Sequence, residues 1–565
     1  MTSEKNYCDG GEGLLEAFRD LGIDYVIVAS GSEWAPYWEA MARQKRDGTK
    51  GPSYIDVWHE TAAVDIAIGY TLVTGRMQAV LLHAGPGLLQ GACGIHGALL
   101  ADVPMLVLSS ESDSYGERPG VDPGSQWYRN LSIVGGPHGL VDHIVKWSNQ
   151  IPGVETLYEM VKRAGEISQR APRGPVYLNA PVEVLLEPWK PSPFPKKIVP
   201  PARKISPQSE IDGLVERVRA AREPVIMTES AGRDPKAFYA LVAFADKFAI
   251  PVIEPQSNVC GNFPKNNPLY LGNDIAPLRD TADLVLLVNC RAPWYPPSNR
   301  PPHATTIVID EVPQRPQVVH QVLFADLYVE GEVADTLARA ALQDGDADLI
   351  EPRRARHAAS HQALRSRIQR AEAAAVGGTA IEAVTLVEAL RETVPAGTIF
   401  VDETITHSRL VQQHLEWSEP HRYFYVQGGL GQGIGVALGV KLAAKDRFVV
   451  LTLGDGAFLY NPVVQALAAS RDNELPVLIV IFNNRRYLSM QYNHLRFYPD
   501  GASVAHNDFY GVNLDTQPDL EAFGLPYGMH CAAVSDPAHL GSALDDAVAA
   551  VEGGRTAIVN VYVTK

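Results

Sequence analysis

The chain has 565 residues, too many for a single hydrophobic core, and its 46% hydrophobic and 20% charged residues are the proportions of a folded globular protein. The formal net charge is −16, and the chain has no Lys/Arg-rich run. It therefore lacks the basic patch expected of a nucleic-acid-binding protein. The five scattered cysteines support neither a disulfide framework nor a zinc site, and the polar start with no long apolar run favours a cytoplasmic protein without a membrane span.

The first part of the chain alternates short apolar runs with helix-like stretches. We expect strands at residues 25–29, 79–82, 105–108 and 176–179. This rhythm is typical of a parallel α/β sheet. It predicts a first domain over residues 1–188, and the proline-rich stretch that follows, up to about residue 201, is expected to be a linker.

A second segment repeats this rhythm over residues 202–343. Its expected strands are residues 224–227, 251–253, 282–288 and 306–310. A charged helical stretch from about residue 351 to 375 follows. The paired glycines Gly377 and Gly378 end it in the way that helices commonly end, so we interpret this stretch as the second connection.

The third segment, residues 379–565, has the same pattern. Its expected strands are residues 398–402, 448–453, 477–482 and 557–563. The sequence therefore predicts an α/β protein with three consecutive domains, each built on a doubly wound parallel sheet.

Two polar motifs follow successive expected strands of the third domain. Residues 454–456 read Gly-Asp-Gly, and an Asn-Asn pair that includes Asn484 ends the next strand. Because the carboxyl ends of parallel strands meet at one edge of a sheet, Asp455 and Asn484 are expected to converge. One carboxylate and one amide oxygen, with the other positions left for phosphate oxygens and water, suit Mg²⁺. The flanking glycines let the backbone approach a diphosphate closely.

This GDG…NN pattern resembles the metal and diphosphate motif of thiamine diphosphate enzymes, in the branch that contains pyruvate decarboxylase, acetolactate synthase and benzoylformate decarboxylase. The resemblance covers nearly the whole chain, in the order pyrimidine-binding, central and diphosphate-binding domain. It implies that thiamine diphosphate is the cofactor, and that Mg²⁺ is held by the side chains of Asp455 and Asn484 and by the backbone carbonyl of Arg486. It also implies an enzyme that cleaves or forms a carbon–carbon bond beside a carbonyl.

The same resemblance assigns further residues to the cofactor. Gly428 and Leu430 lie in a glycine-rich segment that grips the aminopyrimidine in the family, with the leucine between the two rings of the cofactor. Thr404 and Thr406 are placed to donate hydrogen bonds to phosphate oxygens, although isolated threonines are as often ordinary helix caps. The other residues expected to contact the diphosphate are Gly454, Gly456, Ala457, Asn484 and Arg486.

Glu60 stands at the start of an apolar helix that is rich in small residues. An acid in the first turn also complements the helix dipole without any catalytic role. Together with Ala63, Ala67 and Gly69, however, Glu60 matches the family's glutamate motif, which implies that it protonates the pyrimidine ring and so activates the cofactor. In the family this glutamate and the metal motif meet across a subunit boundary, which implies a homodimer or homotetramer.

Three residues of the first domain are candidates for contact with the substrate. Ser32 and His83 lie in segments that resemble pocket loops of benzoylformate decarboxylase. A histidine suits proton transfer near neutral pH, and the alternative is a histidine that is merely hydrogen-bonded at a strand end. Gln126 stands where acetolactate synthases carry a pocket glutamine, whereas His59, beside Glu60, is expected to be structural.

Several departures from the family patterns leave the substrate open. The double histidine of pyruvate decarboxylases is replaced at residues 111–115, and the second histidine of benzoylformate decarboxylase is absent near residues 296–298. Residues 289–297 lack the flavin-binding pattern of acetolactate synthases, so FAD is not expected, and the position of the chain end argues against an acyl-CoA substrate.

Four reactions on a small molecule remain open: 2-oxo acid decarboxylation, acetolactate-type carboligation, acyloin cleavage and hydrolysis of a cyclic diketone. A regulatory protein that binds the cofactor without catalysis is the non-enzyme alternative, and the intact Glu60, Asp455 and Asn484 argue against it. A Rossmann-type dehydrogenase is not supported, because the glycines of residues 428–433 match neither its fingerprint nor its position.

Overall fold

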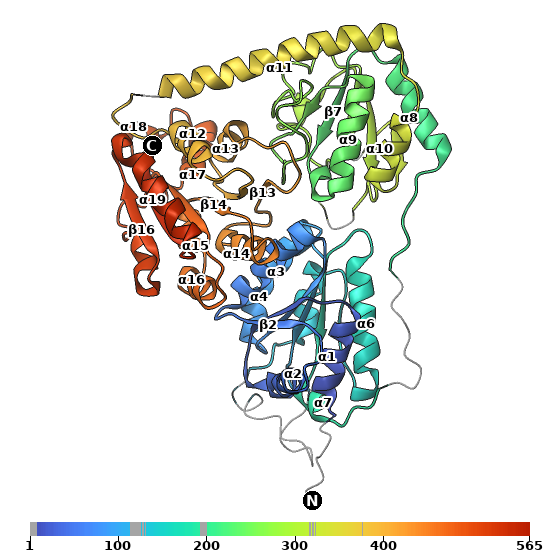
Figure 1. Cartoon of the computed structure of the whole chain (residues 1–565), viewed down its shortest axis with the longest axis vertical. Coiled ribbons are helices and arrows are strands. Elements are labelled where there is room, and N and C mark those ends of the chain that lie inside the picture. The colour runs from blue at the N-terminus through green and yellow to red at the C-terminus, as the bar shows by residue number, and fades with distance from the viewer. Residues whose placement is uncertain are drawn as a thin grey trace, which may run out of the picture. The chain divides into compact units, whose positions relative to one another are not determined.

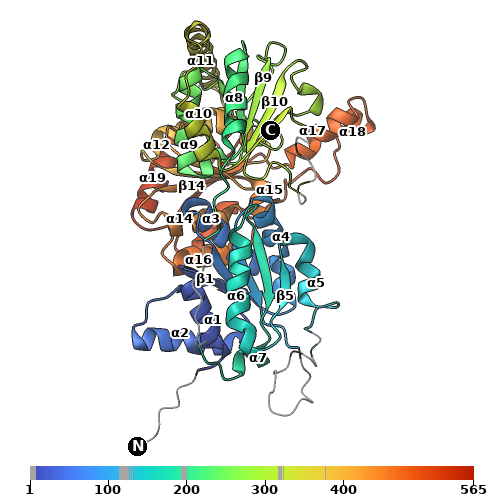
Figure 2. The same ribbon diagram turned by 90° about the vertical axis from the view of Figure 1, so that its right-hand side faces the viewer.

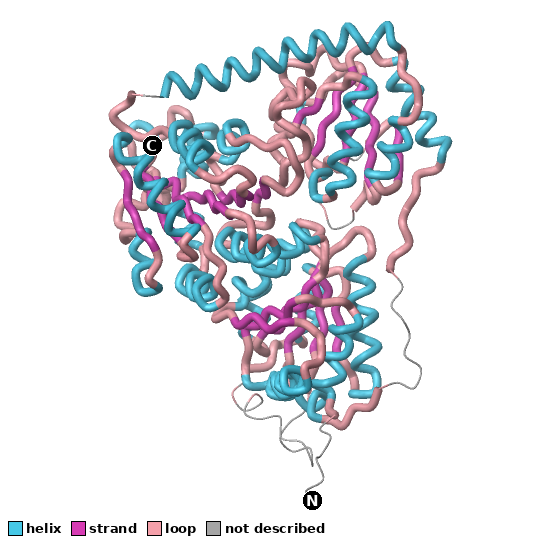
Figure 3. Tube along the Cα trace, viewed as in Figure 1, coloured by secondary structure: helices cyan, strands magenta, loops and turns pink. Residues whose placement is uncertain are grey.

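The computed structural model describes residues 8–113, 126, 129, 131–191, 200–315, 318, 321, 324–375 and 377–564. The described residues form three parallel sheets, each with helices packed around it (Figure 1, Figure 3). This confirms the expected α/β class with three doubly wound parallel sheets along the chain. The expected proline-rich linker lies largely outside the described residues. No helix within the described ranges is long and apolar enough to cross a bilayer.

The first sheet, drawn in blue to teal in Figure 1, has the strand order β2-β1-β3-β4-β6-β5. Its strands are β1 (Tyr25–Ala29), β2 (Ser53–Asp56), β3 (Gln78–Leu82), β4 (Met105–Ser109), β5 (Ser148–Gln150) and β6 (Pro175–Asn179). Its helices are α1 (Gly10–Asp20), α2 (Ala35–Asp47), α3 (Glu60–Thr74), α4 (Pro86–Leu100), α5 (Pro137–Val141), α6 (Val154–Gln169) and α7 (Val182–Leu186). Helices α1 and α6 pack side by side (Figure 2). The strand order reverses between β1 and β3.

The second sheet has the order β11-β10-β9-β7-β8, and its order reverses between β7 and β9. Its strands are β7 (Pro224–Thr228), β8 (Val252–Ile253), β9 (Leu284–Val288), β10 (Thr305–Asp310) and β11 (Leu327–Glu330). Its helices are α8 (Gln208–Ala220), α9 (Pro235–Phe248) and α10 (Val333–Ala341). The long helix α11 (Ala347–Ala375) follows, and Gly377 beyond it has a φ of 88°, as expected for a residue just past a helix end.

The third sheet has the order β13-β12-β14-β15-β17-β16, with its reversal between β12 and β14. Its strands are β12 (Ile399–Glu403), β13 (Tyr423–Tyr425), β14 (Val449–Gly454), β15 (Leu478–Asn483), β16 (His530–Val534) and β17 (Ala557–Tyr562). The helices of this part are α12 (Ala383–Thr393), α13 (Ser408–His414), α14 (Gly433–Ala443), α15 (Asp455–Tyr460), α16 (Val463–Asp472), α17 (Leu488–Phe497), α18 (Ala502–His506) and α19 (Leu540–Glu552).

By packing, the chain divides into two compact units. One comprises Met1–Ala202, Gln427–Ala444 and Pro462–Leu475, and the other comprises Arg203–Val426, Lys445–Asn461 and Pro476–Lys565. Helix α14 therefore belongs with the N-terminal unit, where it packs on α3. Glycine makes this contact close, because a Cβ on Gly69 would lie 2.0 Å from the Val436 carbonyl oxygen. The central strands, such as β3, β9 and β15, are buried along their whole length.

Candidate active site

Glu60 and His83 are neighbours at the carboxyl edge of the first sheet, where doubly wound sheets bind ligands. Glu60 is the first residue of α3, and His59 caps this helix by accepting a hydrogen bond on Nδ1 from the Thr61 backbone N–H at 3.2 Å. His83 directly follows β3. A Cβ on Gly87 would lie 2.7 Å from Glu60 Oε1 and 2.7 Å from the Cβ of His83, so both side chains border the same glycine.

The imidazole of His83 is held by Glu33, an acid that was not among the residues expected at the site. His83 Nδ1 lies 2.7 Å from Glu33 Oε1, and this oxygen also accepts a hydrogen bond from the Ala84 backbone N–H at 2.8 Å. The side chain of Glu33 is 1% exposed and that of His83 is 30% exposed. The hydrogen bond to Glu33 raises the pKa of His83 above its ordinary value, and burial opposes this shift. Glu33 therefore favours the imidazolium and leaves Nε2 as the ring nitrogen for a ligand.

The loop after β1 has to approach His83 closely to bring Glu33 there. A Cβ on Gly31 would lie 1.9 Å from His83 Nδ1 and 2.3 Å from Glu33 Oε2, so the position requires glycine. Ser32 begins the 3₁₀ helix η1 (Ser32–Trp34) and is exposed, whereas the Glu33 side chain is buried. The signal for Glu33 was available in the sequence, since the acid directly follows Ser32 in the loop that resembles benzoylformate decarboxylase.

Gln126 is buried in the segment that follows β4. Its Oε1 accepts a hydrogen bond from the Ser112 backbone N–H at 2.9 Å, and its Nε2 donates to the Ser110 carbonyl at 3.3 Å. Both polar ends of the amide are thus bonded to main chain, and they hold the strand end in place. A contact of Gln126 with substrate stays a prediction.

Asp455 has the surroundings of a metal ligand. It begins α15 directly after β14 and is 2% exposed. Its Oδ1 accepts a hydrogen bond from the Gly456 N–H at 2.9 Å, whereas its Oδ2 is buried and has no hydrogen-bond partner among the described residues. Burial raises the pKa of Asp455 to about 6, against the lowering effect of nearby backbone N–H groups. A buried carboxylate oxygen without a partner is costly, and a bound cation would satisfy it.

The loop after β15 lies against Asp455. The backbone N–H groups of Arg485 and Arg486 lie near enough to lower the pKa of Asp455, although they donate their hydrogen bonds to Asn483 and Asn484. Asn484 is 5% exposed, and its Oδ1 accepts a hydrogen bond from the Arg486 N–H at 2.9 Å, which leaves one lone pair of this oxygen for another partner. One carboxylate, one amide oxygen and one backbone carbonyl form a donor set that fits Mg²⁺. Elsewhere in the described chain, no cluster of three or more His, Cys, Asp or Glu side chains is placed to hold a metal.

The glycines on either side of Asp455 differ in their surroundings. A Cβ on Gly454 would meet no atom within 4 Å, so this residue borders open space that a diphosphate can fill. A Cβ on Gly456 would lie 2.4 Å from the ring of Tyr487, so this glycine is needed for packing. Ala457 is buried in α15. Of the three, Gly454 has the clearest access to a ligand.

The two threonines lie beyond the end of β12, on the other side of the reversal point. The hydroxyl of Thr404 donates a hydrogen bond to Asp402 Oδ1 at 2.7 Å and is buried, so it serves the strand end in this structure. Thr406 is partly exposed in the turn before α13. A contact of either residue with phosphate stays a prediction.

The glycine-rich segment with Gly428 and Leu430 belongs to the same packing unit as Glu60 and His83. Gly428 has a φ of 101°, and a Cβ there would lie 2.3 Å from the Cα of Gly97 on α4. Leu430 is half-buried. The segment is thus pressed against the N-terminal part of the chain, where the predicted acid lies.

This fold and these two strand-end sites define a three-sheet α/β protein with a histidine–glutamate pair at the first sheet and a candidate metal and diphosphate site at the third. Three models of thiamine pyrophosphate enzymes match the chain: the N-terminal TPP binding domain at residues 8–132, the central domain at residues 211–340 and the C-terminal TPP binding domain at residues 404–561. The matched ranges together cover most of the chain, which therefore belongs to the thiamine pyrophosphate (thiamine diphosphate) enzyme family, as expected.

Individual relatives agree with this. The acetolactate synthase isozyme 3 large subunit of Escherichia coli (strain K12) is 24% identical over 98% of this chain and 94% of its own. Benzoylformate decarboxylase of Pseudomonas aeruginosa is 25% identical over 84% of this chain and 86% of its own. The structure of the thiamine diphosphate-dependent 4-hydroxybenzoylformate decarboxylase of Rhodococcus jostii RHA1 covers 99% of both chains with a TM-score of 0.80 and 22% identity. The expected class, a thiamine diphosphate-dependent enzyme related to acetolactate synthase and benzoylformate decarboxylase, is confirmed.

Proposed function

We propose that this enzyme is a 2-oxo acid decarboxylase that holds thiamine diphosphate through Mg²⁺ and uses His83 for proton transfer. The observation that carries the proposal is the pair formed by His83 and the buried Glu33, beside Glu60 at the carboxyl edge of the first sheet. Such a pair suits a reaction that ends with protonation of carbon, because a positioned imidazolium is a proton donor near neutral pH. The similarity to benzoylformate decarboxylase supports the substrate class.

Each residue has a distinct task under this proposal. Thiamine diphosphate, when bound, supplies the carbon nucleophile and the electron sink for the bond that breaks. Glu60 holds the proton that the pyrimidine ring requires. Asp455, Asn484 and the Arg486 carbonyl hold the cation that neutralises the diphosphate charge. His83 moves a proton through Nε2, since its Nδ1 is engaged with Glu33.

Acetolactate-type carboligation is the second candidate, and the similarity to acetolactate synthase over 98% of the chain favours it. In that reaction a second carbonyl compound, rather than a proton, meets the reacting carbon. Product formation then requires protonation of an alkoxide oxygen, and no proton is delivered to carbon. The requirement for His83 therefore separates the two candidates. Acyloin cleavage and diketone hydrolysis use the same cofactor chemistry, and no observation favours them.

The proposal is tested with a substrate panel. Purified protein, supplied with thiamine diphosphate and Mg²⁺, is assayed with pyruvate, benzoylformate, longer 2-oxo acids, acyloins and cyclic diketones. Carbon dioxide, aldehydes and ligated products are each quantified. Aldehyde formation that depends on His83 supports the decarboxylase. Ligated products as the main outcome, formed equally well by His83→Ala, contradict it in favour of the carboligase.

We also propose a homodimer or homotetramer in the cytoplasm, with active sites that combine Glu60 of one subunit with the metal motif of another. The family arrangement supports this. Complementation tests it, because mixed dimers of Glu60→Gln and Asp455→Ala would contain one intact site if the sites are shared. Each variant alone should be inactive, and co-refolding or co-expression should restore activity. Continued inactivity of the mixed dimers would exclude shared sites.

A further inference from the structure

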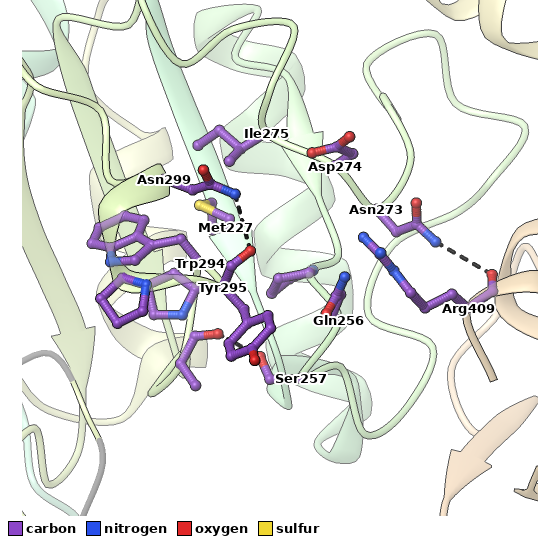
Figure 4. A pocket seen from close by; sticks show the side chains of 14 residues that line it. Met227, Gln256, Ser257, Asn273, Asp274, Ile275, Trp294, Tyr295, Asn299 and Arg409 are labelled. Atoms are coloured by element: carbon purple, nitrogen blue, oxygen red, sulfur yellow. Dashed lines mark hydrogen bonds between the residues drawn. The ribbon is translucent and has the colours of Figure 1, made fainter. Parts of the chain in front are cut away.

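The reversal point of the second sheet holds a pocket that the proposed reaction does not use. Strand β8 lies on one side of β7, and the next strand in the chain, β9, lies on the other side. Doubly wound sheets bind ligands at such a reversal of strand order. A cavity of about 520 Å³ opens there, within the volume range of small-molecule sites. Its lining comes from the ends of all three strands, with Met227 from β7, Gln256 after β8 and Trp294 after β9 (Figure 4).

The pocket has an apolar side and a cationic side. Met227, Ile275, Trp294 and Tyr295 form the apolar side, and Arg409 of α13 stands opposite them in Figure 4. This division predicts a ligand with an apolar body and one negative end.

Arg409 is a positioned cation at the pocket wall: burial lowers its pKa, and the nearby Asp274 carboxylate opposes this shift without forming an ion pair with it. The Asn273 Nδ2 donates a hydrogen bond to the Arg409 carbonyl at 3.3 Å, which ties the start of α13 to the pocket wall. With its amide oxygen turned toward Arg409, Gln256 accepts hydrogen bonds from Nε at 2.8 Å, from Nη2 at 2.5 Å and from Nη1. No Asp or Glu among the described residues forms an ion pair with this guanidinium. The guanidinium N–H groups that Gln256 does not engage can still donate to a carboxylate.

A polyphosphate fits this pocket poorly. The carboxylate of Asp274 lines the same side as Arg409 and would repel a second negative charge. The backbone at the end of β9 is also engaged, because the Arg291 N–H donates to the buried carboxylate of Glu229 at 2.6 Å. A nucleotide site presents free backbone N–H groups to phosphate. At the end of β9, the Glu229 carboxylate occupies such an N–H group.

We propose that this pocket is a second ligand site, which binds a small monocarboxylate with an aromatic or branched apolar body. The carboxylate pairs with Arg409, and the body packs on Trp294 and Met227. Neither contact requires the cofactor, so the inference is independent of the proposed reaction.

Isothermal titration of the full-length protein, with thiamine diphosphate and Mg²⁺ present, tests the proposal with phenylacetate as the probe and phenylacetamide as its neutral counterpart. Phenylacetate should bind, and the amide should bind about tenfold more weakly or not at all. Arg409→Gln should raise the Kd for phenylacetate about tenfold or more, and Trp294→Ala should raise it as well. Arg279→Gln is the matched control, because this nearby arginine already pairs with Asp280 and does not line the pocket.

Three further variants separate this site from the reaction site. Glu60→Gln, His83→Ala and Asp455→Ala should lose catalysis and keep the Kd for phenylacetate. If these variants lose binding while Arg409→Gln keeps it, the probe binds at the reaction site and the proposal is overturned. Absent binding of phenylacetate, or equal binding of the amide, also overturns it.

Binding of ADP or FAD that depends on Arg409 would overturn the ligand class in favour of a nucleotide. Thermal melts of each variant check folding. If Arg409→Gln does not fold, Arg409→Lys keeps the test valid, because an ammonium retains the charge and loses the bidentate geometry. This variant should bind phenylacetate with intermediate affinity, and an affinity equal to wild type would exclude the guanidinium contact.

Discussion

His83 Nδ1 and Glu33 Oε1 lie 2.7 Å apart, although the two residues are 50 positions apart in the chain. The pair joins the ends of β1 and β3 across the reversal point of the first sheet. The carboxylate is almost completely buried, whereas the imidazole is partly exposed. The acid therefore fixes the orientation of the imidazole from the interior of the protein and stabilises its protonated form. The proton chemistry expected of His83 therefore depends on Glu33 as a positioning residue.

Replacing Glu33 with Gln should lower the pKa of His83, because the hydrogen bond to Glu33 is the main cause of its upward shift. An NMR titration of the imidazole signal, assigned with a His83→Gln sample, measures the change. Glu39→Gln is the control, since this acid lies on α2 with a 61% exposed side chain. An unchanged His83 pKa in Glu33→Gln would show that the pair does not control the protonation of the imidazole.

The same pair makes a prediction for stability. The pKa of His83 is higher in the folded than in the unfolded protein, so protonation of His83 stabilises the fold. This stabilisation is complete at a pH below the pKa of the unfolded state, and it is lost as the pH rises through the pKa of the folded state. The loss in free energy of unfolding caused by His83→Gln should thus be larger at about pH 5.5 than at about pH 8.5. Urea denaturation at both values tests this, and an equal or reversed difference would contradict the charged pair.

Asp455→Ala should abolish retention of thiamine diphosphate in the presence of Mg²⁺, because the diphosphate loses its cationic bridge. Isothermal titration with the cofactor measures this. The metal-free protein should not become less stable in Asp455→Asn, since this substitution removes the negative charge of a buried carboxylate, which burial disfavours. Asp446→Ala, at an exposed position before β14, is the control. Unchanged cofactor affinity in Asp455→Ala would remove the assigned metal site.

Glu60→Gln should leave the fold and cofactor binding nearly intact but slow hydrogen–deuterium exchange at the cofactor C2 by orders of magnitude. The physical reason is that an amide cannot supply the proton that the pyrimidine ring requires. Quenched-flow exchange followed by NMR gives the rate. A normal rate in this variant would take Glu60 out of the activation step.

His83→Ala should spare that exchange and reduce turnover about 10²- to 10⁴-fold, the range for loss of one acid–base group. Turnover of the active 2-oxo acid and C2 exchange are measured on the same preparation. Glu33→Gln should lie between wild type and His83→Ala in turnover, because it weakens the imidazolium without removing the ring. If turnover is unaffected by both substitutions, the pair is structural.

The strands in the interior of each sheet were predictable from the sequence. Strands such as β3, β9 and β15 are buried on both faces, so nearly every residue is apolar and the run is visible in the chain. Five strands were not expected from the sequence, and each lies at an edge of its sheet: β2, β5, β11, β13 and β16. An edge strand has one neighbour and partly exposed residues, so its place is decided by pairing with a distant strand.

The same division holds for the sites. Glu60, Asp455 and Asn484 could be selected from the sequence because each stands in a local motif at a helix start or a strand end. Tertiary structure alone decided that Glu33 holds His83 and that Gln126 is bonded to main chain. It also placed Arg409 opposite Trp294 across a pocket, although 115 positions separate them in the sequence. Local chemistry is encoded in neighbouring residues, whereas the choice of a partner for a charge depends on which strand ends the sheet brings together.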